Sequence, residues 1–191
     1  MNKIITVNIV GGLGNQMFQY AFGYAVAKEN DCKLRLDTSS FNASKKRKYK
    51  LDLFKIKENS EYKFKYFNFF SMVNCKNNFF FNKLISKFIR LILRFSSFYY
   101  HEKEEFSFDK NVFTIEENTY FYGYWQNEKY FEKYRNDILK IFKQQEIHKK
   151  TKEYRQKIIT VDSVSIHIRR GDYVTDSYIN SIHGTCEIDY Y

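Results

Sequence analysis

The sequence has no proline among its 191 residues, and it contains only three cysteines. Cys32, Cys75 and Cys186 lie far apart and form no C-x-x-C pair. This spacing argues against a disulfide framework or a zinc site and favours a reducing, cytoplasmic compartment. No stretch is long and apolar enough to span a bilayer, so the sequence predicts no transmembrane helix.

Acidic residues are fewer than basic residues: the sequence has 22 acidic and 32 basic residues, so its net charge is +10. Such an excess suits an anionic partner, such as a nucleotide, a nucleic acid or an acidic membrane. The chain is also rich in Phe, Tyr, Lys, Asn and Ile, whose codons are A/T-rich. Codon bias therefore explains much of the positive charge, and the charge alone does not identify the partner.

The nearest approach to a long apolar run is segment 79–98, which four basic residues interrupt. On a helix these residues share one narrow stripe, opposite an apolar face. We expect a surface helix that packs on its own domain. The alternative is peripheral attachment of residues 83–95 to the inner face of an anionic membrane. The four basic residues are Lys83, Lys87, Arg90 and Arg94.

The first 37 residues predict a βαβ unit. Residues 4–10 are β-branched and end in Gly-Gly, as a strand before a tight turn does. Residues 15–29 have the apolar spacing of a helix, and residues 33–37 form a second short strand. A strand, a glycine turn, a helix and a strand are typical of an α/β fold with a doubly wound sheet.

Further along the chain, the pattern predicts helix over most of 59–100, a strand at 119–124 and a helix at 130–142. Alternation over 158–168 predicts another strand, with His167 and Arg169 on one side of it. We expect a complete N-terminal Rossmann-like domain at 1–157 and the start of a second domain at 158–191, which is incomplete in this chain.

The turn Gly11-Gly12-Leu13-Gly14 lacks the Lys-Ser/Thr of a P-loop and the spacing of a dinucleotide fingerprint. It would let a phosphate or sugar approach backbone N–H groups at a helix N-terminus. Asn15 and Gln16 would add side-chain amides beside that anion. The alternative is a strand-to-helix turn that needs glycine only for its backbone conformation.

A second motif, His167-Ile168-Arg169-Arg170-Gly171-Asp172, follows the late strand. Arg169 and Arg170 can bind phosphate oxygens in a bidentate manner, and Asp172 can orient an arginine. His167 can bond a phosphate or a ribose. The alternatives are a satisfied histidine under a sheet and arginines in surface ion pairs. Metal catalysis is not indicated, because D-x-D, H-E-x-x-H and Cys/His clusters are missing from the sequence.

Four segments resemble the bacterial galactoside α-1,2-fucosyltransferases of glycosyltransferase family 11. They are 11–25 (GGLGNQMFQYAFGYA), 165–174 (SIHIRRGDYV), 123–126 (GYWQ) with 130–131, and 183–186 (HGTC) with 189–191. The resemblance implies a GT-B architecture of two Rossmann-like domains. It also implies an inverting, metal-independent transfer of L-fucose from GDP-β-L-fucose to the 2-hydroxyl of a galactose-containing acceptor in surface-glycan biosynthesis, without a cofactor.

The resemblance also implies site residues. By this resemblance, the residues that bind GDP-fucose are His167, Arg169, Arg170 and Asp172. The resemblance also places a turn near the donor, the one that carries Gly12, Gly14, Asn15 and Gln16. Residues 41–117 would face the acceptor, with Trp125 or nearby aromatic rings stacking on a sugar. Asp172 and His183 are the candidates for the catalytic base. Because most of the guanosine pocket of the family lies in a later segment, we expect this chain alone to be inactive.

Two other functions remain open at this point. One is a non-catalytic protein that binds nucleic acid or an anionic surface, as the charge and the interleaved Tyr, Phe and Lys allow. Because no nucleic-acid-binding signature occurs in the sequence, we expect no nucleic-acid partner. The other is a decayed remnant of the enzyme, translated but without function.

Overall fold

The computed structural model describes residues 3–43, 47–54, 56, 98–115, 118–143, 148–168 and 170–190. The chain divides into two compact units, Met1–Gln145 and Glu146–Tyr191. The sequence places residues up to 157 in the first domain, whereas in the structure helix α6 (Lys149–Ile159) belongs to the second unit. The assignment of 1–157 and 158–191 to an acceptor side and a donor side remains a prediction.

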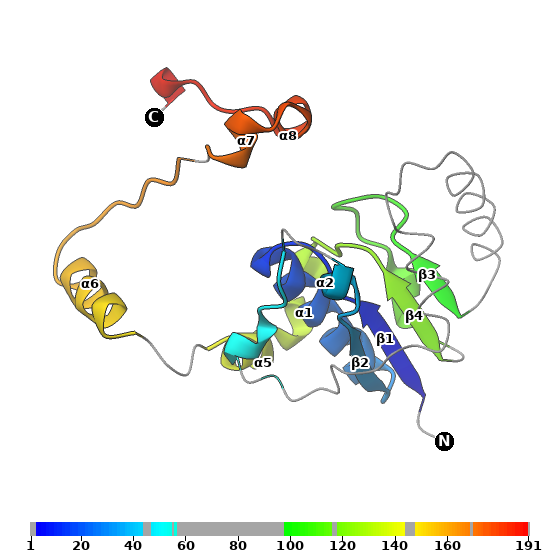
Figure 1. The fold of residues 1–191 in the computed structure, drawn as a ribbon. Helices are drawn as coiled ribbons and strands as arrows, with labels where there is room; N and C mark the ends of the chain where they lie inside the picture. The colour runs from blue at the N-terminus through cyan, green and yellow to red at the C-terminus, as the bar shows by residue number, and fades with distance from the viewer. Residues whose placement is uncertain are drawn as a thin grey trace. The chain divides into compact units, whose positions relative to one another are not determined.

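The first unit is built on a parallel sheet of four strands in the order β2-β1-β4-β3 (Figure 1). The predicted βαβ start is confirmed: β1 (Ile4–Asn8) leads into α1 (Leu13–Glu29), which returns to β2 (Lys33–Asp37). The predicted strand at 119–124 is also confirmed as β4 (Thr119–Tyr122). The α/β class of the fold therefore follows from the sequence pattern.

The core lies between the sheet and α1. Ile5, Val7 and Phe22 are fully buried there, as alternation along a strand and the 3.6-residue period of a helix dictate. Gly23 lets the helix approach the sheet closely, because a Cβ at this position would lie 2.8 Å from both Val7 Cγ2 and Leu34 Cδ1. Burial of this apolar surface is the main stabilising contribution to the unit.

Two predicted elements of the first unit differ in the structure. The helix expected over 130–142 is shorter: two 3₁₀ turns, Glu128–Tyr130 and Glu132–Tyr134, precede α5 (Arg135–Ile141). Tyr130 is buried in the core, where its hydroxyl donates to Ser107 O (3.0 Å) and accepts from Asp109 N (2.9 Å). These long-range bonds set the path of the chain in place of local helical periodicity.

Segment 59–100 is predicted to be largely helical, but its last residues form strand β3 (Tyr99–His101), which pairs with β4. The rest of that segment, including the amphipathic stretch 79–98 and the membrane contact at 83–95, lies outside the described residues. Within the described part of the chain, α2 (Ser40–Ala43) and the 3₁₀ turns Leu51–Phe54 and Lys110–Phe113 complete the first unit. None of the helices described there or in the second unit has the length and apolarity to cross a bilayer.

The second unit contains α6, α7 (Asp172–Thr175), α8 (Ser177–His183) and a 3₁₀ turn at Ile188–Tyr190. The predicted strand at 158–168 is wrong: its first two residues end α6, and 162–168 has no regular structure. A strand needs a neighbour to satisfy its backbone groups, and the described residues of this unit form no other strand. Its alternating apolar side chains are exposed, Val164 to 91%.

Candidate active site at the carboxyl edge of the sheet

The order of the strands marks a candidate site. From the central strand β1 the chain turns to β2 on one side, while β4 lies on the other side. In open α/β sheets, ligands bind outside the carboxyl ends of the strands where the strand order reverses in this way. The segments at that point are 9–12, which links β1 to α1, and 123–127, which follows β4.

The glycine turn opens this site to a ligand. Gly11 has a φ of +81°, and a Cβ there would lie 2.6 Å from Asn15 Nδ2, so the position requires glycine. A Cβ at Gly12 or Gly14 would meet nothing within 4 Å. Gly12 is the N-cap of α1, and among the described residues no side chain caps this helix end. The backbone N–H groups of the first turn therefore have no side-chain cap among the described residues, as anion binding at a helix N-terminus needs.

Asn15 joins the two segments of the site. Its Oδ1 accepts a hydrogen bond from Gln126 Nε2 at 2.8 Å, although the two residues are 111 positions apart. The amide pair holds the start of α1 against the segment after β4. Two regions singled out separately in the sequence, the glycine turn and the Gly123-Tyr124-Trp125-Gln126 run, are thus brought together.

The structure corrects the expected role of Gln16. This side chain is fully buried, and its Nε2 donates to Gly11 O (3.0 Å) and Lys48 O (2.9 Å). Its Oε1 accepts from Lys50 N (2.9 Å). Because both amide hydrogens are used on backbone carbonyls, Gln16 holds the turn in shape instead of donating to an anion.

Sequence reasoning missed Gln19, which makes a similar link. Its Oε1 accepts from Val10 N (2.9 Å), and its Nε2 donates to Gly123 O (3.0 Å). Gln19 is fully buried and so ties the exit of β1 to the exit of β4 through the core. An amide on the apolar face of the predicted helix, three positions after Gln16, was the signal available in the sequence.

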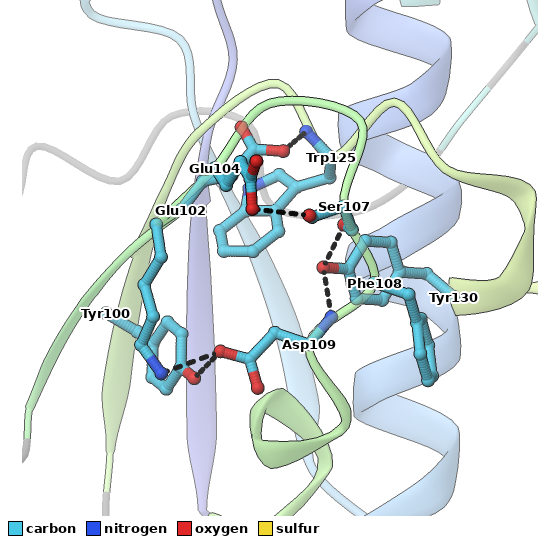
Figure 2. Close-up of a pocket in the computed structure, with 9 residues that line it drawn as sticks. Tyr100, Glu102, Glu104, Ser107, Phe108, Asp109, Trp125 and Tyr130 are labelled. Carbon is cyan, nitrogen blue, oxygen red and sulfur yellow. Dashed lines mark hydrogen bonds and ion pairs between the residues drawn. The ribbon is translucent and has the colours of Figure 1, made fainter.

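Glu102 was also missed, and it shapes the segment after β4. Its Oε2 accepts from Tyr124 N (2.6 Å). Its Oε1 accepts from Trp125 N (3.0 Å) (Figure 2). Burial raises the pKa of this carboxyl, while the two backbone N–H groups oppose that rise. Gly123 leaves the room this contact needs, because a Cβ there would lie 2.5 Å from Glu102 Cβ. Trp125 is held at a φ of +56°.

A cavity of about 190 Å³ adjoins this segment, between residues 100–109 and 125–130 (Figure 2). Asp109 lies at its wall, where its Oδ2 accepts from Tyr100 OH (2.7 Å) and pairs with Lys103 Nζ (2.8 Å). Burial alone would raise the pKa of Asp109, but the hydrogen bonds from Lys103, Tyr100 and the Asn111 backbone lower it to about 2. Burial and the bond to Asp109 raise the pKa of Tyr100 to about 12.

A buried polar group also occupies the carboxyl end of β2. Asp37 accepts a hydrogen bond from Tyr120 OH at 2.6 Å and also binds the Ser39 hydroxyl. Burial raises the pKa of Tyr120 well above its usual value, and the Asp37 charge adds to this rise. Metal binding needs several ligands together, and within the described residues no three His, Cys, Asp or Glu side chains are grouped in this way.

The second motif lies in the second unit. His167 and Arg170 are exposed there. Gly171 adopts a φ of +61° and its carbonyl accepts from Val174 N (2.9 Å) at the start of α7. Arg169 and the side chains of Asp172 and His183 lie outside the described part of the chain.

Comparison with known proteins identifies the family to which this chain belongs. The profile of glycosyl transferase family 11 matches residues 1–191. The chain belongs to glycosyl transferase family 11. The resemblance carried by the four sequence segments is therefore confirmed. In this member of family 11, the first and third of those segments meet through Asn15 and Gln126.

Two relatives from Escherichia coli match along nearly the whole chain. An alpha-1,2-colitosyltransferase is 36% identical over 193 residues, which cover 99% of this chain and 62% of the relative. The O-antigen biosynthesis glycosyltransferase WbnK is 29% identical over 201 residues, which cover 95% of this chain and 63% of the relative. The chain thus spans less than two thirds of the length of either relative. No solved structure matches it.

Proposed function

We propose that this chain is part of an inverting, metal-independent glycosyltransferase that transfers L-fucose from GDP-β-L-fucose to the 2-hydroxyl of a galactose in a surface glycan. The observation that carries the proposal is the open glycine turn, held against the segment after β4 by Asn15 and Gln126. It lies at the ligand-binding edge of a parallel sheet, in a chain that family 11 covers from end to end.

In this proposal the protein has a GT-B architecture, with the acceptor side in 1–157 and the donor side beginning at 158–191. The N-terminus of α1, with Gly12, Gly14 and Asn15, approaches the sugar and the diphosphate. His167, Arg169, Arg170 and Asp172 bind GDP and neutralise the diphosphate as it leaves. Gln16 supports this role indirectly by holding the turn.

The reaction is a single in-line displacement. The acceptor 2-hydroxyl oxygen attacks the anomeric carbon from the face opposite GDP, and the bond between that carbon and the diphosphate oxygen breaks as the new one forms. The negative charge that develops on GDP is stabilised by arginine and by backbone N–H groups, so no metal ion is needed. The hydroxyl proton passes to a base, for which Asp172 and His183 are the candidates.

A second donor has specific support. One relative is named as an alpha-1,2-colitosyltransferase and is 36% identical to this chain. Colitose differs from L-fucose by the absence of the 3-hydroxyl. A site built to hydrogen-bond that hydroxyl rejects the analogue that lacks it, so the protein would strongly prefer one of the two donors. A competition between GDP-fucose and GDP-colitose for binding distinguishes them.

The test of the donor site is GDP binding by calorimetry. We expect any GDP binding by the chain to depend on the arginine pair, so the double variant Arg169→Ala, Arg170→Ala should lose it, because it removes both guanidinium groups. Arg155→Ala is the matched control, since Arg155 is exposed on α6 outside the motif. Equal binding by all three proteins would count against the proposal, whereas no binding by a chain that melts cooperatively would mean that the donor pocket needs the later segment of the family.

We also propose that the protein is cytoplasmic, with contact between residues 83–95 and the inner face of the membrane as the alternative to a surface helix that packs on its own domain. The support is the basic stripe opposite an apolar face. Co-sedimentation with liposomes should increase with their anionic lipid content. Sedimentation that ignores the lipid charge would remove this part of the proposal.

A further inference from the structure

The cavity beside Trp125 has the size of a site for one small ligand. Its volume of about 190 Å³ is below the roughly 300–1,000 Å³ of pockets that hold drug-sized ligands. It is many times the roughly 30 Å³ that one water molecule occupies in the liquid. Figure 2 shows its walls coming from the strand end at Tyr100, the following segment and the turn that carries Tyr130. These dimensions suit a single sugar ring better than an extended oligosaccharide.

The lining combines aromatic rings with oxygen acceptors. Phe108 is 41% exposed and its ring lies 5.0 Å from that of Tyr130, so one face of the cavity is apolar. Glu104 and Ser107 also line the cavity, and they are joined by a hydrogen bond of 3.0 Å from the hydroxyl to the carboxylate. A pyranose has the matching chemistry, with an apolar C–H face and hydroxyl groups at its rim.

The charge of the cavity excludes an anion. Glu102, Glu104 and Asp109 contribute carboxyl groups, and Lys103 is the basic residue of the lining. Asp109 stays ionised at neutral pH because its pKa is about 2. Lys103 is already paired with it at 2.8 Å. A phosphate or a GDP molecule would meet carboxylates here, so the ligand is not an anion and differs from the donor.

Trp125 lines the cavity and carries a polar group that the described residues leave unpaired. The side chain is fully buried, and its Nε1–H has no hydrogen-bond acceptor among the described residues. Buried indole N–H groups usually have a partner. The adjoining ring atom Cε2 lies 3.0 Å from the Cβ position of Gly123. An acceptor oxygen that reached this N–H would satisfy a group that the described residues leave unpaired.

The cavity is also tied to the glycine turn. Trp125 lines it, and the next residue, Gln126, holds Asn15 at the start of α1. We propose that this cavity is the acceptor subsite, which holds one neutral pyranose ring between Phe108 and the acceptors Glu104 and Ser107. The assignment of the cavity as an acceptor site rests on the proposed function. Binding of a sugar in the cavity can be tested independently of that function.

Trp125 makes a direct test practical, because it is the only tryptophan in the 191 residues. The chain is titrated with methyl β-D-galactopyranoside while the indole fluorescence is recorded. We expect a saturable change. The affinity should fall about tenfold in Glu104→Gln, which loses a charged acceptor, and about fivefold or more in Phe108→Ala, which loses the apolar face. Galacturonic acid should bind more weakly than the neutral sugar.

Phe98→Ala is the matched control, because Phe98 is 42% exposed and does not line the cavity. It should bind as the unchanged protein does, and thermal melts should verify that each variant folds. The inference is overturned if the signal does not saturate, if glycerol or GDP produces the same change, or if Glu104→Gln and Phe108→Ala both bind normally. Sugar binding by a chain whose GDP binding survives the loss of both Arg169 and Arg170 would keep this subsite and remove the proposed donor site.

Discussion

The two units of this chain carry one motif each, but they support those motifs differently. In the first unit the glycine turn rests on buried side chains, among them Gln16, Gln19 and Phe22. In the second unit none of the described side chains is buried, and apolar residues such as Ile166 are mostly exposed. The same chain therefore contains a site with its supporting core and a motif whose support must come from other surfaces.

The contrast shows how a short motif becomes a site. The glycine turn is positioned by amides that reach the backbone at Val10, Gly123, Lys48 and Lys50. These bonds are shielded from water, so they hold one geometry. In the second unit the described bonds of the motif are local, such as that from Val174 N to Gly171 O. A local turn orients its backbone but does not by itself position a side chain.

The largest expected effect tests whether the buried core belongs to the first unit and not to the second. Phe22→Ala should lower the free energy of unfolding by about 3–5 kcal/mol, because it empties the space between Trp125 and Phe121. Ile166→Ala, at 65% exposure, should change it by less than about 0.5 kcal/mol. Urea unfolding followed by Trp125 fluorescence measures both. A loss above about 2 kcal/mol in Ile166→Ala would show that segment 162–168 is covered, and would break the comparison.

A smaller effect tests the buried amides. Gln19→Met keeps the length of the side chain but leaves Val10 N–H and Gly123 C=O without their partner, which should cost roughly 2–4 kcal/mol. Gln156→Met, on the exposed face of α6, is the control and should be nearly neutral. Thermal unfolding compares the two. Equal stability of both variants would mean that Gln19 does not hold the two segments together.

The smallest effect concerns pH. The pKa of Asp109 falls from its usual 3.8 to about 2, so its contribution is complete above pH 4 and is lost as the pH drops toward 2. We expect about 1 kcal/mol, reduced by solvent at the partly exposed pair with Lys103. Melting temperatures between pH 2 and 6 should drop less steeply in Asp109→Asn than in Asp162→Asn, an exposed control. Parallel profiles would remove this pair from the stabilising interactions.

The sequence predicted elements well where local periodicity and burial agree. Strand β1, helix α1 and strand β2 follow each other closely, and each has enough apolar residues on one face to define its period. Prediction failed where long-range contacts decide. Strand β3 has three residues, too few for a period, and it exists because β4 pairs with it. The strand expected at 158–168 had the right alternation but has no described neighbour to pair with.

The candidate site also has parts that could be predicted from the sequence and parts that could not. The glycine turn and the Gly123–Gln126 run could each be found in the sequence, since unusual residues at fixed spacing identify them. Their contact through Asn15 and Gln126 could not, because nothing local joins residues 111 positions apart. No pattern in the sequence identifies Glu102, because its carboxylate binds two backbone N–H groups of the segment that follows β4.

The sequence by itself determined the family, the α/β class and the turn at the start of α1, because these depend on residue types and short periods. The tertiary structure alone decided that Gln16 supports the turn instead of binding a ligand, and that a cavity lies beside Trp125. The physical reason is that a side chain's hydrogen bonds and the space around it depend on burial. Burial is a property of the assembled sheet and helix, and no single segment of the chain carries it.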